Sequence, residues 1–197
     1  MENVVSLNST LSAKVDALSD IYYPRKRAFT LSKMSVEQIF QSTNMKSNQT
    51  IIAVDPGVGG GFAVSTAEGI LLFPMPESLP DMAQLISGFK VAESHLWVEK
   101  VPKFVSKLTP SSSVATLHEN YGIVQGLAYS QGYALHRVEP KVWQDPLGLG
   151  GKKSCATGPE WKRKLKSKAQ ELYPHLDVTL KNCDALLILH YALGGGR

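Results

Sequence analysis

The sequence contains little cysteine and no long apolar run. Its two cysteines, Cys155 and Cys183, form no Cys-x-x-Cys pair, so neither a disulfide framework nor a zinc site is expected. No apolar stretch approaches the ~20 residues of a membrane-spanning helix, and we expect no membrane partner. Charged residues make up 19% of the 197 residues and hydrophobic residues 43%. These proportions exclude a disordered chain and predict a full core of ordinary domain size. The sequence contains no internal repeat.

The chain divides into a weakly patterned arm, residues 1–48, and a patterned domain, residues 49–197. In the arm, residues 4–17 and 35–40 have short amphipathic patterns, and Arg25-Lys26-Arg27 is a basic cluster. We expect an accessory arm that is partly disordered or helical. The chain begins Met-Glu-Asn, without the charged and apolar regions of a secretory signal. The Ser-rich, basic arm leaves an organellar location open as an alternative to the cytoplasm.

The net charge of +4 is unevenly distributed along the chain. Residues 49–100 carry two basic and six acidic side chains, whereas residues 101–153 carry six and three, and residues 154–197 seven and four. Acidic groups near a metal, surrounded by Lys and Arg, suit an enzyme that acts on a phosphate polymer. Ordinary variation of surface charge is the alternative interpretation.

The segment Ile51 to Val64 has the strongest local pattern. Four apolar residues run directly into Asp55, Pro56 and four glycines turn the chain, and a second apolar run follows. The pattern predicts a buried strand, a tight turn and an antiparallel return strand. The glycines leave room beside Asp55 for a phosphate or a metal ion. An ordinary hairpin with an Asp-Pro-Gly turn is the alternative.

The remaining pattern predicts a mixed five-stranded sheet flanked by helices, which is an α/β fold. Three antiparallel strands are followed by two that return parallel to the first, because a helix precedes each of them. Segment 176–180 is expected to be short and extended, and Gly122 and Gly126 to allow close approach of another backbone, across the sheet or across a dimer. The expected strands are residues 50–55, 61–67, 70–73, 95–98 and 133–138. The expected helices are 81–89, 113–131, 159–173 and 182–193, and residues 139–143 start a short helix or a turn.

Three carboxylates occupy special places in this pattern. Asp55 ends the first strand, Glu99 ends the fourth, and Asp184 lies in the first turn of the last helix. Because these acids repel one another, a cluster of them needs cations, and oxygen ligands suit Mg²⁺ or Mn²⁺. Two such ions about 4 Å apart activate a water and stabilise the leaving oxygen of a phosphodiester. Taken singly, each acid has a purely structural alternative. Asp55 can cap a turn, Glu99 can be a solvated strand end, and Asp184 can be an acid favoured by the helix dipole at a helix start.

Six segments in order resemble the RuvC-type Holliday junction resolvases of the RNase H-like superfamily, especially their phage and organellar relatives. The resemblance covers residues 50–193 and leaves only the arm uncovered. The matching segments are Ala53-Val54-Asp55-Pro56-Gly57, Trp97-Val98-Glu99-Lys100-Val101, Asn120 to Gly126, Val138 to Trp143, Leu172-Tyr173-Pro174 and Asp184 to Ile188.

The resemblance implies an RNase H-like fold and a homodimer that grips a four-way DNA junction and nicks two opposed strands. By motif, Asp55, Glu99 and Asp184 are the metal ligands, and two Mg²⁺ or Mn²⁺ ions are expected per active site. A cytoplasmic location in a bacterial or phage-infected cell is also expected.

The chain departs from the family pattern at the fourth acidic ligand. The family places that ligand three or four residues before the last acid, where this chain has Leu180 and Lys181. Lys181 is a candidate catalytic residue, because its ammonium can take the place of a metal or contact the scissile phosphate. Asp177 and His190 are possible substitute ligands.

A second departure lies after the fourth strand. The bacterial enzyme has a Phe three residues after its strand-four Glu that wedges into the junction, and this chain has Pro102 there. Phe104 is the alternative wedge, or else a loop anchor.

The expected DNA contacts are ionic, because a junction presents phosphates on all sides. A solvated helix face is the other reading of the same basic residues, and Trp143 and Trp161 are expected in the core. The candidate DNA-binding residues are Lys103, Phe104, Lys107, Lys152, Lys153, Lys162, Arg163 and Lys166.

The sequence therefore predicts a metal-dependent endonuclease that resolves four-way DNA junctions. A catalytically weak or inactive junction-binding protein is the alternative, because the fourth acid is missing, and another RNase H-like nuclease is a third reading. An actin-like ATPase needs a duplicated domain and a second glycine-rich phosphate loop, and the chain has neither.

Overall fold

A mixed sheet forms the centre of the domain. The computed structural model of the chain describes residues 49–103 and 110–195. Its five strands lie in the order β3-β2-β1-β4-β5. Strands β1, β2 and β3 are antiparallel neighbours, and β4 and β5 run parallel to β1. This is the α/β, RNase H-like arrangement expected from the sequence. The strands are β1 (Gln49–Asp55), β2 (Gly61–Thr66), β3 (Gly69–Pro74), β4 (Glu93–Glu99) and β5 (Ala134–Val138).

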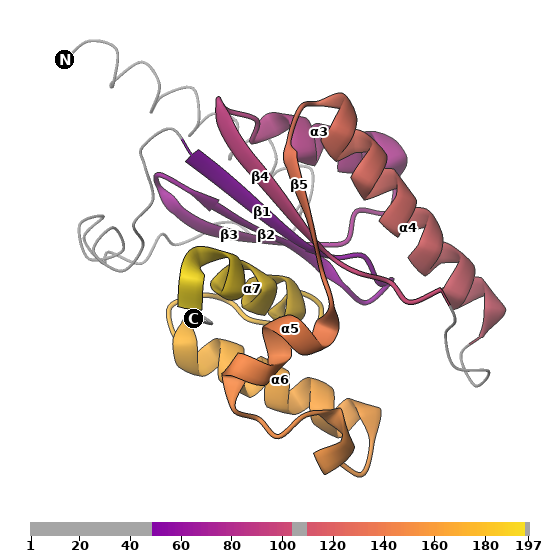
Figure 1. The fold of residues 1–197 in the computed structure, drawn as a ribbon, viewed down its shortest axis with the longest axis vertical. Coiled ribbons are helices and arrows are strands. Elements are labelled where there is room, and N and C mark those ends of the chain that lie inside the picture. Colours follow the sequence, from indigo (N-terminus) through magenta and orange to yellow (C-terminus); the bar gives the residue numbers. More distant parts are fainter. Residues whose placement is uncertain (1–48, 104–109, 196–197) are drawn as a thin grey trace. The chain divides into compact units, whose positions relative to one another are not determined.

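Helices cover both faces of this sheet. Figure 1 shows α3 and α4 on one face and α7 on the other, with α6 packed outside α7. In the described part of the chain no helix is long and apolar enough to cross a membrane. The helices are α3 (Leu79–Gly88), α4 (Ser111–Ser130), α5 (Pro140–Gln144), α6 (Gly158–Leu172) and α7 (Cys183–His190), with 3-10 turns η1 (Asp145–Leu147) and η2 (Lys152–Ser154) and a final π turn η3 (Tyr191–Gly195).

Helix α7 is buried because it is apolar on every side. Cys183 and the run Ala185 to Leu189 are fully buried between the sheet and α6. Helix α6 is amphipathic, and it turns Trp161, Leu165 and Ala169 toward this core. Trp161 thus lies in the core, as the sequence indicated.

The alternation of side chains along β1 and β4 places the two strand-end acids on the α7 face. Ile51 and Ala53 belong to the core cluster that includes α7, and Asp55 is the next residue of the same parity. Trp97 packs against the same cluster, and Glu99 follows it with the same parity. Because Val54 pairs with Val98 in the parallel register, both acids end neighbouring strands at one edge of the sheet.

Two local expectations concern segment 176–180 and the glycines of α4. Residues 177–179 have no regular secondary structure and join no strand of the sheet, and the N–H of Thr179 donates a hydrogen bond to Asn182 Oδ1. Among the described residues, Gly122 and Gly126 bring α4 close to no other backbone, because a Cβ on either one would meet nothing within 4 Å, and their close approach across a dimer stays a prediction. The expectations for the arm, Phe104 and Lys107 lie outside the described residues.

Candidate active site

Asp55 is held at the end of β1 by the turn that follows it. The backbone N–H of Gly57 donates to Asp55 Oδ1 over 3.1 Å. A Cβ on Gly60 would lie 2.2 Å from the Asp55 carbonyl oxygen and 2.7 Å from its Cγ, so only glycine fits there. Asn120 of α4 donates to the Pro56 carbonyl over 3.1 Å and ties the turn to the helix above it. The turn therefore fixes the direction of the Asp55 carboxylate.

Glu99 is oriented by a buried tryptophan. The indole N–H of Trp143, on α5, donates to Glu99 Oε2 over 2.9 Å. Trp143 is fully buried, which confirms its expected place in the core and gives it a second role at the site. Short helix α5 begins at Pro140, directly after β5, so the chain returns from the sheet edge to cover Glu99.

Asp184 lies in the first turn of α7, and the preceding turn is tied by the side chain of Asn182. Its amide oxygen accepts from Thr179 N–H over 2.7 Å, and its amide nitrogen donates to the Asp177 carbonyl over 3.2 Å. The thiol of Cys183 donates to Asp184 Oδ1 over 3.3 Å. These bonds set where α7 begins and hence where Asp184 stands.

Lys162 joins two of the acids. Its ammonium lies 2.6 Å from Asp184 Oδ2 and 3.6 Å from Asp55 Oδ2. The side chains are shielded, with 27% of Lys162, 13% of Asp55 and 14% of Asp184 exposed. Lys162 belongs to the first turns of α6, whose N-cap Thr157 accepts from the N–H of Glu160. The sequence predicted Lys162 as a DNA contact and did not predict its place among the carboxylates.

The carboxylates hold more negative charge than Lys162 compensates. Burial and the neighbouring charge of Asp184 raise the pKa of Asp55, although Lys162 and the Gly57 N–H oppose this. Burial, then Asp55 and Asp184, raise the pKa of Glu99 to about 8, against the hydrogen bond from Trp143. Burial disfavours the ammonium of Lys162, but Asp184 and Asp55 outweigh it and raise its pKa. A further cation would therefore be stabilised at this site.

The donor chemistry of the site fits a hard divalent cation. Asp55, Glu99 and Asp184 supply only oxygen, the ligand type of Mg²⁺ and Mn²⁺. Asp55 and Asp184 already converge on one cation, the ammonium of Lys162. Among the described residues, however, no three Asp, Glu, His or Cys side chains lie together as a ready-made metal site. A metal would thus draw the carboxylates away from their present partners.

The three residues proposed to compensate for the missing fourth acid lie in surroundings different from those of the acid cluster. Lys181 is exposed, and the ammonium found between the acids belongs to Lys162. Asp177 is exposed in the turn before α7. His190 lies at the far end of α7, where its Nδ1 shares a hydrogen bond of 3.0 Å with the hydroxyl of Tyr173.

The remaining basic candidates lie on loops and on α6. Lys103, Lys152, Lys153 and Arg163 are exposed, and Lys166 is half-buried.

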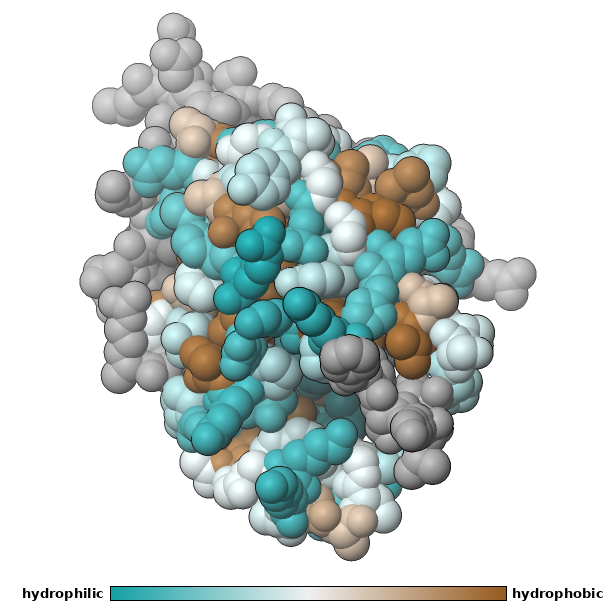
Figure 2. Space-filling model, turned by 45° about the vertical axis from the view of Figure 1, so that its right-hand side comes forward, coloured by the Kyte–Doolittle hydropathy of each residue, from teal (hydrophilic) through white to brown (hydrophobic). Residues whose placement is uncertain are grey.

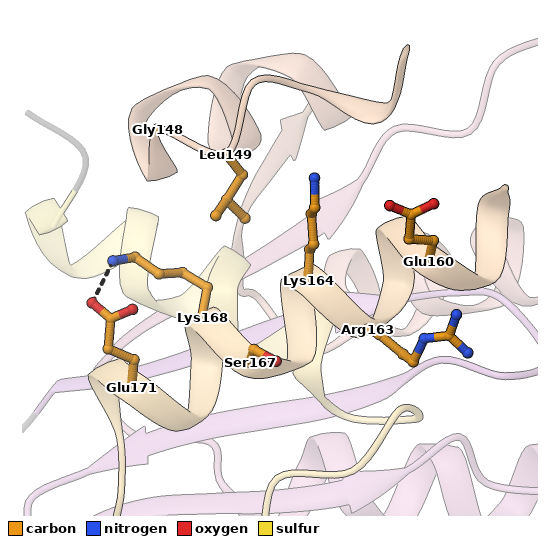
Figure 3. Close-up of a pocket in the computed structure, with 8 residues that line it drawn as sticks. All are labelled: Gly148, Leu149, Glu160, Arg163, Lys164, Ser167, Lys168 and Glu171. Carbon is orange, nitrogen blue, oxygen red and sulfur yellow. Dashed lines mark hydrogen bonds and ion pairs between the residues drawn. The ribbon is translucent and has the colours of Figure 1, made fainter. Parts of the chain in front are cut away.

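A groove of about 520 Å³ runs along α6, between the helix and the loop at Gly148 and Leu149. Figure 3 shows Lys164 and Leu149 directed into it, and Lys168 paired with Glu171 at one end. Since none of Asp55, Glu99 and Asp184 lines it, the groove is separate from the acid cluster.

The roles of three residues at the site were not predicted from the sequence. Lys162 lay in a run of basic residues, which offers no local signal to separate one lysine from the next. Trp143 was expected in the core, without a role at the site. Asn120 was quoted in a motif without a role. Their contacts are long-range in sequence, so only spatial proximity reveals them.

The chain is similar, at low sequence identity, to solved structures of RuvC. No protein-family model and no curated protein sequence matches the chain. Solved structures that resemble it include RuvC from T. thermophilus in complex with a Holliday junction substrate, at 14% identity and a TM-score of 0.49, covering 75% of this chain and 94% of that one. A second Thermus thermophilus RuvC structure has 16% identity and a TM-score of 0.48, covering 75% of this chain and 97% of the other.

Proposed function

We propose that the chain is a divalent-metal-dependent endonuclease that resolves four-way DNA junctions by paired phosphodiester hydrolysis. One observation carries the proposal: Asp55, Glu99 and Asp184 come from three separate elements to one end of an RNase H-like sheet. Lys162 connects two of these acids directly. The four-way junction is inferred as the substrate from the six segments of the sequence that resemble RuvC-type resolvases.

In this proposal each residue of the site has a definite task. Asp55, Glu99 and Asp184 hold Mg²⁺ or Mn²⁺, which when bound supplies an activated water and stabilises the leaving oxygen. Asp55 is fixed by the N–H of Gly57, and Glu99 by the indole of Trp143. Lys162 adds positive charge where the phosphate's negative charge increases in the transition state.

The DNA backbone is bound by the basic residues around the site. The exposed lysines and Arg163 can bind the phosphates of the DNA backbone, and such contacts do not depend on the base sequence. Figure 2 shows that hydrophilic side chains cover much of one face of the molecule and that hydrophobic patches there are small and separate. Such a surface suits a highly charged partner, and the binding should weaken steeply with salt.

A homodimer places two such sites on opposed strands of one junction. The exposed face of α4 is the candidate interface, because Gly122 and Gly126 leave open space along it. Only Val124 and Ala128 of this 20-residue helix are fully buried in the chain itself.

The test is cleavage of a labelled synthetic four-way junction. Asp55→Asn should abolish nicking in Mg²⁺ and leave junction binding intact, because it removes a metal ligand and keeps the shape of the side chain. Asp145→Asn is the matched control, since Asp145 is exposed on η1, and it should cleave like the wild type. Normal cleavage by Asp55→Asn would show that the site is assigned wrongly.

A second candidate function is junction binding without cleavage. It is favoured by one observation: Leu180 and Lys181, at the place of the fourth acid, are exposed and non-acidic. Nicks made by the purified wild type in Mg²⁺ or Mn²⁺ would exclude it. A panel of junction, flap, duplex and RNA–DNA hybrid substrates separates a resolvase from another RNase H-like nuclease.

A further inference from the structure

Lys162 occupies the position of a cation within the acid cluster. Its ammonium is within ion-pair distance of carboxylate oxygens from both β1 and α7, at 3.6 Å and 2.6 Å. Both are ordinary ion-pair distances; what distinguishes Lys162 is that it contacts two acids at once and that about three-quarters of its side chain is shielded from water.

The helix that carries Lys162 is anchored. Trp161, directly before it, is 5% exposed, and Leu165, one turn later, is 1% exposed. Both belong to the core cluster that includes α7. The packing of these two neighbours therefore holds the backbone of Lys162 close to the acids. The ammonium can leave the cluster only if the side chain changes its rotamer.

Charge matching indicates how many divalent ions this cluster accommodates. Four carboxylates balance two divalent cations, which is the arrangement implied for the family. Here three carboxylates, all ionised when they hold a metal, and one ammonium leave two negative charges, which one divalent ion balances. A second ion would make the site positive and would approach the ammonium at short range in a shielded environment.

We propose that the ammonium of Lys162 takes the place of one of the two divalent cations, so that each site holds a single Mg²⁺ or Mn²⁺ ion. This inference rests on the proposed function, because it concerns the metal of that same site. It assigns to Lys162 the compensating role that the sequence suggested for Lys181. The loss of an acid near position 180 and the presence of Lys162 between the acids are then two parts of one arrangement.

The test is the stoichiometry of Mn²⁺ binding, which needs no catalytic readout. Metal-stripped wild-type protein is titrated with Mn²⁺ at low ionic strength, and free Mn²⁺ is followed by electron paramagnetic resonance. The wild type should bind one ion per chain, and Asp55→Asn should lose it. Lys162→Met should bind a second ion, or one ion at least about tenfold more tightly, because the competing charge is gone.

Two control variants separate this effect from net charge and from folding. Lys164→Met has the same net charge as Lys162→Met but lines the outer groove, so it should behave like the wild type. Lys162→Arg keeps the positive charge and should bind one ion with wild-type affinity. If Lys162→Met fails to fold by circular dichroism, the wild type and Lys162→Arg still test the inference.

Two ions per wild-type chain would overturn the inference, as would a Lys162→Met variant with unchanged number and affinity. The outcome is independent of the proposed activity. Two ions on a protein that nicks junctions would refute only this inference. One ion on a protein that nicks no substrate would leave the inference standing and refute the proposed activity.

Discussion

At the scale of single residues, the main feature is a buried surplus of negative charge. Glu99 shows it most clearly, because the pKa of its carboxyl reaches about 8 through burial and through the charges of Asp55 and Asp184. In the folded chain it keeps its proton over a range in which the unfolded chain, with an ordinary value of 4.5, has lost it. Without metal, the folded state therefore binds more protons than the unfolded state in this range.

The metal-free wild type should lose stability as the pH rises from about 4.5 to about 8. The loss should be on the order of a few kcal/mol in the free energy of unfolding. Glu99→Gln removes the titrating group, so its stability should fall less, and at pH 8 it should exceed the wild type. Urea denaturation in EDTA at pH 5 and pH 8 measures both.

Glu139→Gln is the control for this prediction, since Glu139 is exposed and its bond to Lys100 lowers its pKa. The control should show the same loss between pH 5 and 8 as the wild type. A Glu99→Gln variant that loses stability as steeply as the wild type would show that Glu99 is ionised in the folded state.

At the scale of elements, the site depends on two turns: the one after β1 and the one before α7. The first needs a glycine at one position and tolerates a side chain next to it. A Cβ at Gly60 would collide with the backbone and carboxylate of Asp55, whereas a Cβ at Gly59 would meet nothing within 4 Å. The pair offers a matched test of how closely the turn holds Asp55.

Gly60→Ala should lower the free energy of unfolding by about 1–3 kcal/mol and reduce junction cleavage, because the added methyl displaces Asp55. Gly59→Ala should stay within about 0.5 kcal/mol of the wild type and cleave normally. Thermal unfolding and a nicking assay measure the two effects. Equal behaviour of the two variants would contradict the close contact at Gly60.

The second turn depends on Asn182, which is 6% exposed. Asn182→Ala removes the partners of the Thr179 N–H and the Asp177 carbonyl, and the expected loss is about 1–3 kcal/mol. The exposed Ser87→Ala, which loses one hydrogen bond to the Gln84 carbonyl, should cost less than about 0.5 kcal/mol. Denaturant titrations of both variants check this, and a neutral Asn182→Ala would show that water replaces the amide.

At the scale of the whole molecule, the proposed activity needs two active sites on one junction. The exposed glycines of α4 offer a surface on which a second copy can approach closely, since neither glycine packs against the part of its own chain that the structure describes. An interface there would leave the acid cluster of each copy free, because α4 and α7 cover opposite faces of the sheet (Figure 1).

Gly122→Arg combined with Gly126→Arg should convert the proposed dimer to monomer and leave the fold of each chain intact. A side chain at either position has open space in the monomer, and replacing glycine within a helix favours the helix. Sedimentation velocity measures the association. Gln170→Arg, on the exposed face of α6, adds the same kind of charge elsewhere and should leave the dimer intact. A dimeric double variant would place the interface on another surface.

The sequence by itself determined the order of the strands and where the three acids stand on the elements: at the ends of two strands and in the first turn of a helix. Short apolar runs define β1 and β4, and the alternation of side chains along a strand places Asp55 and Glu99 on one face. Asp184 followed from an apolar helix that has to be buried. These signals are local, because hydrophobic periodicity is a property of neighbouring residues.

Only the tertiary structure decided which groups surround the acids. Lys162 lies 22 residues from Asp184 and 107 from Asp55, and Trp143 lies 44 residues from Glu99. The directions of the Lys162 and Trp143 side chains depend on how α5 and α6 pack around α7. A run of lysines in the sequence does not indicate which of them will point toward the acids. The sequence predicted an ammonium group from Lys181 near the acids. In the structure this group belongs to Lys162, because the packing of α6 decides which lysine side chain reaches Asp55 and Asp184.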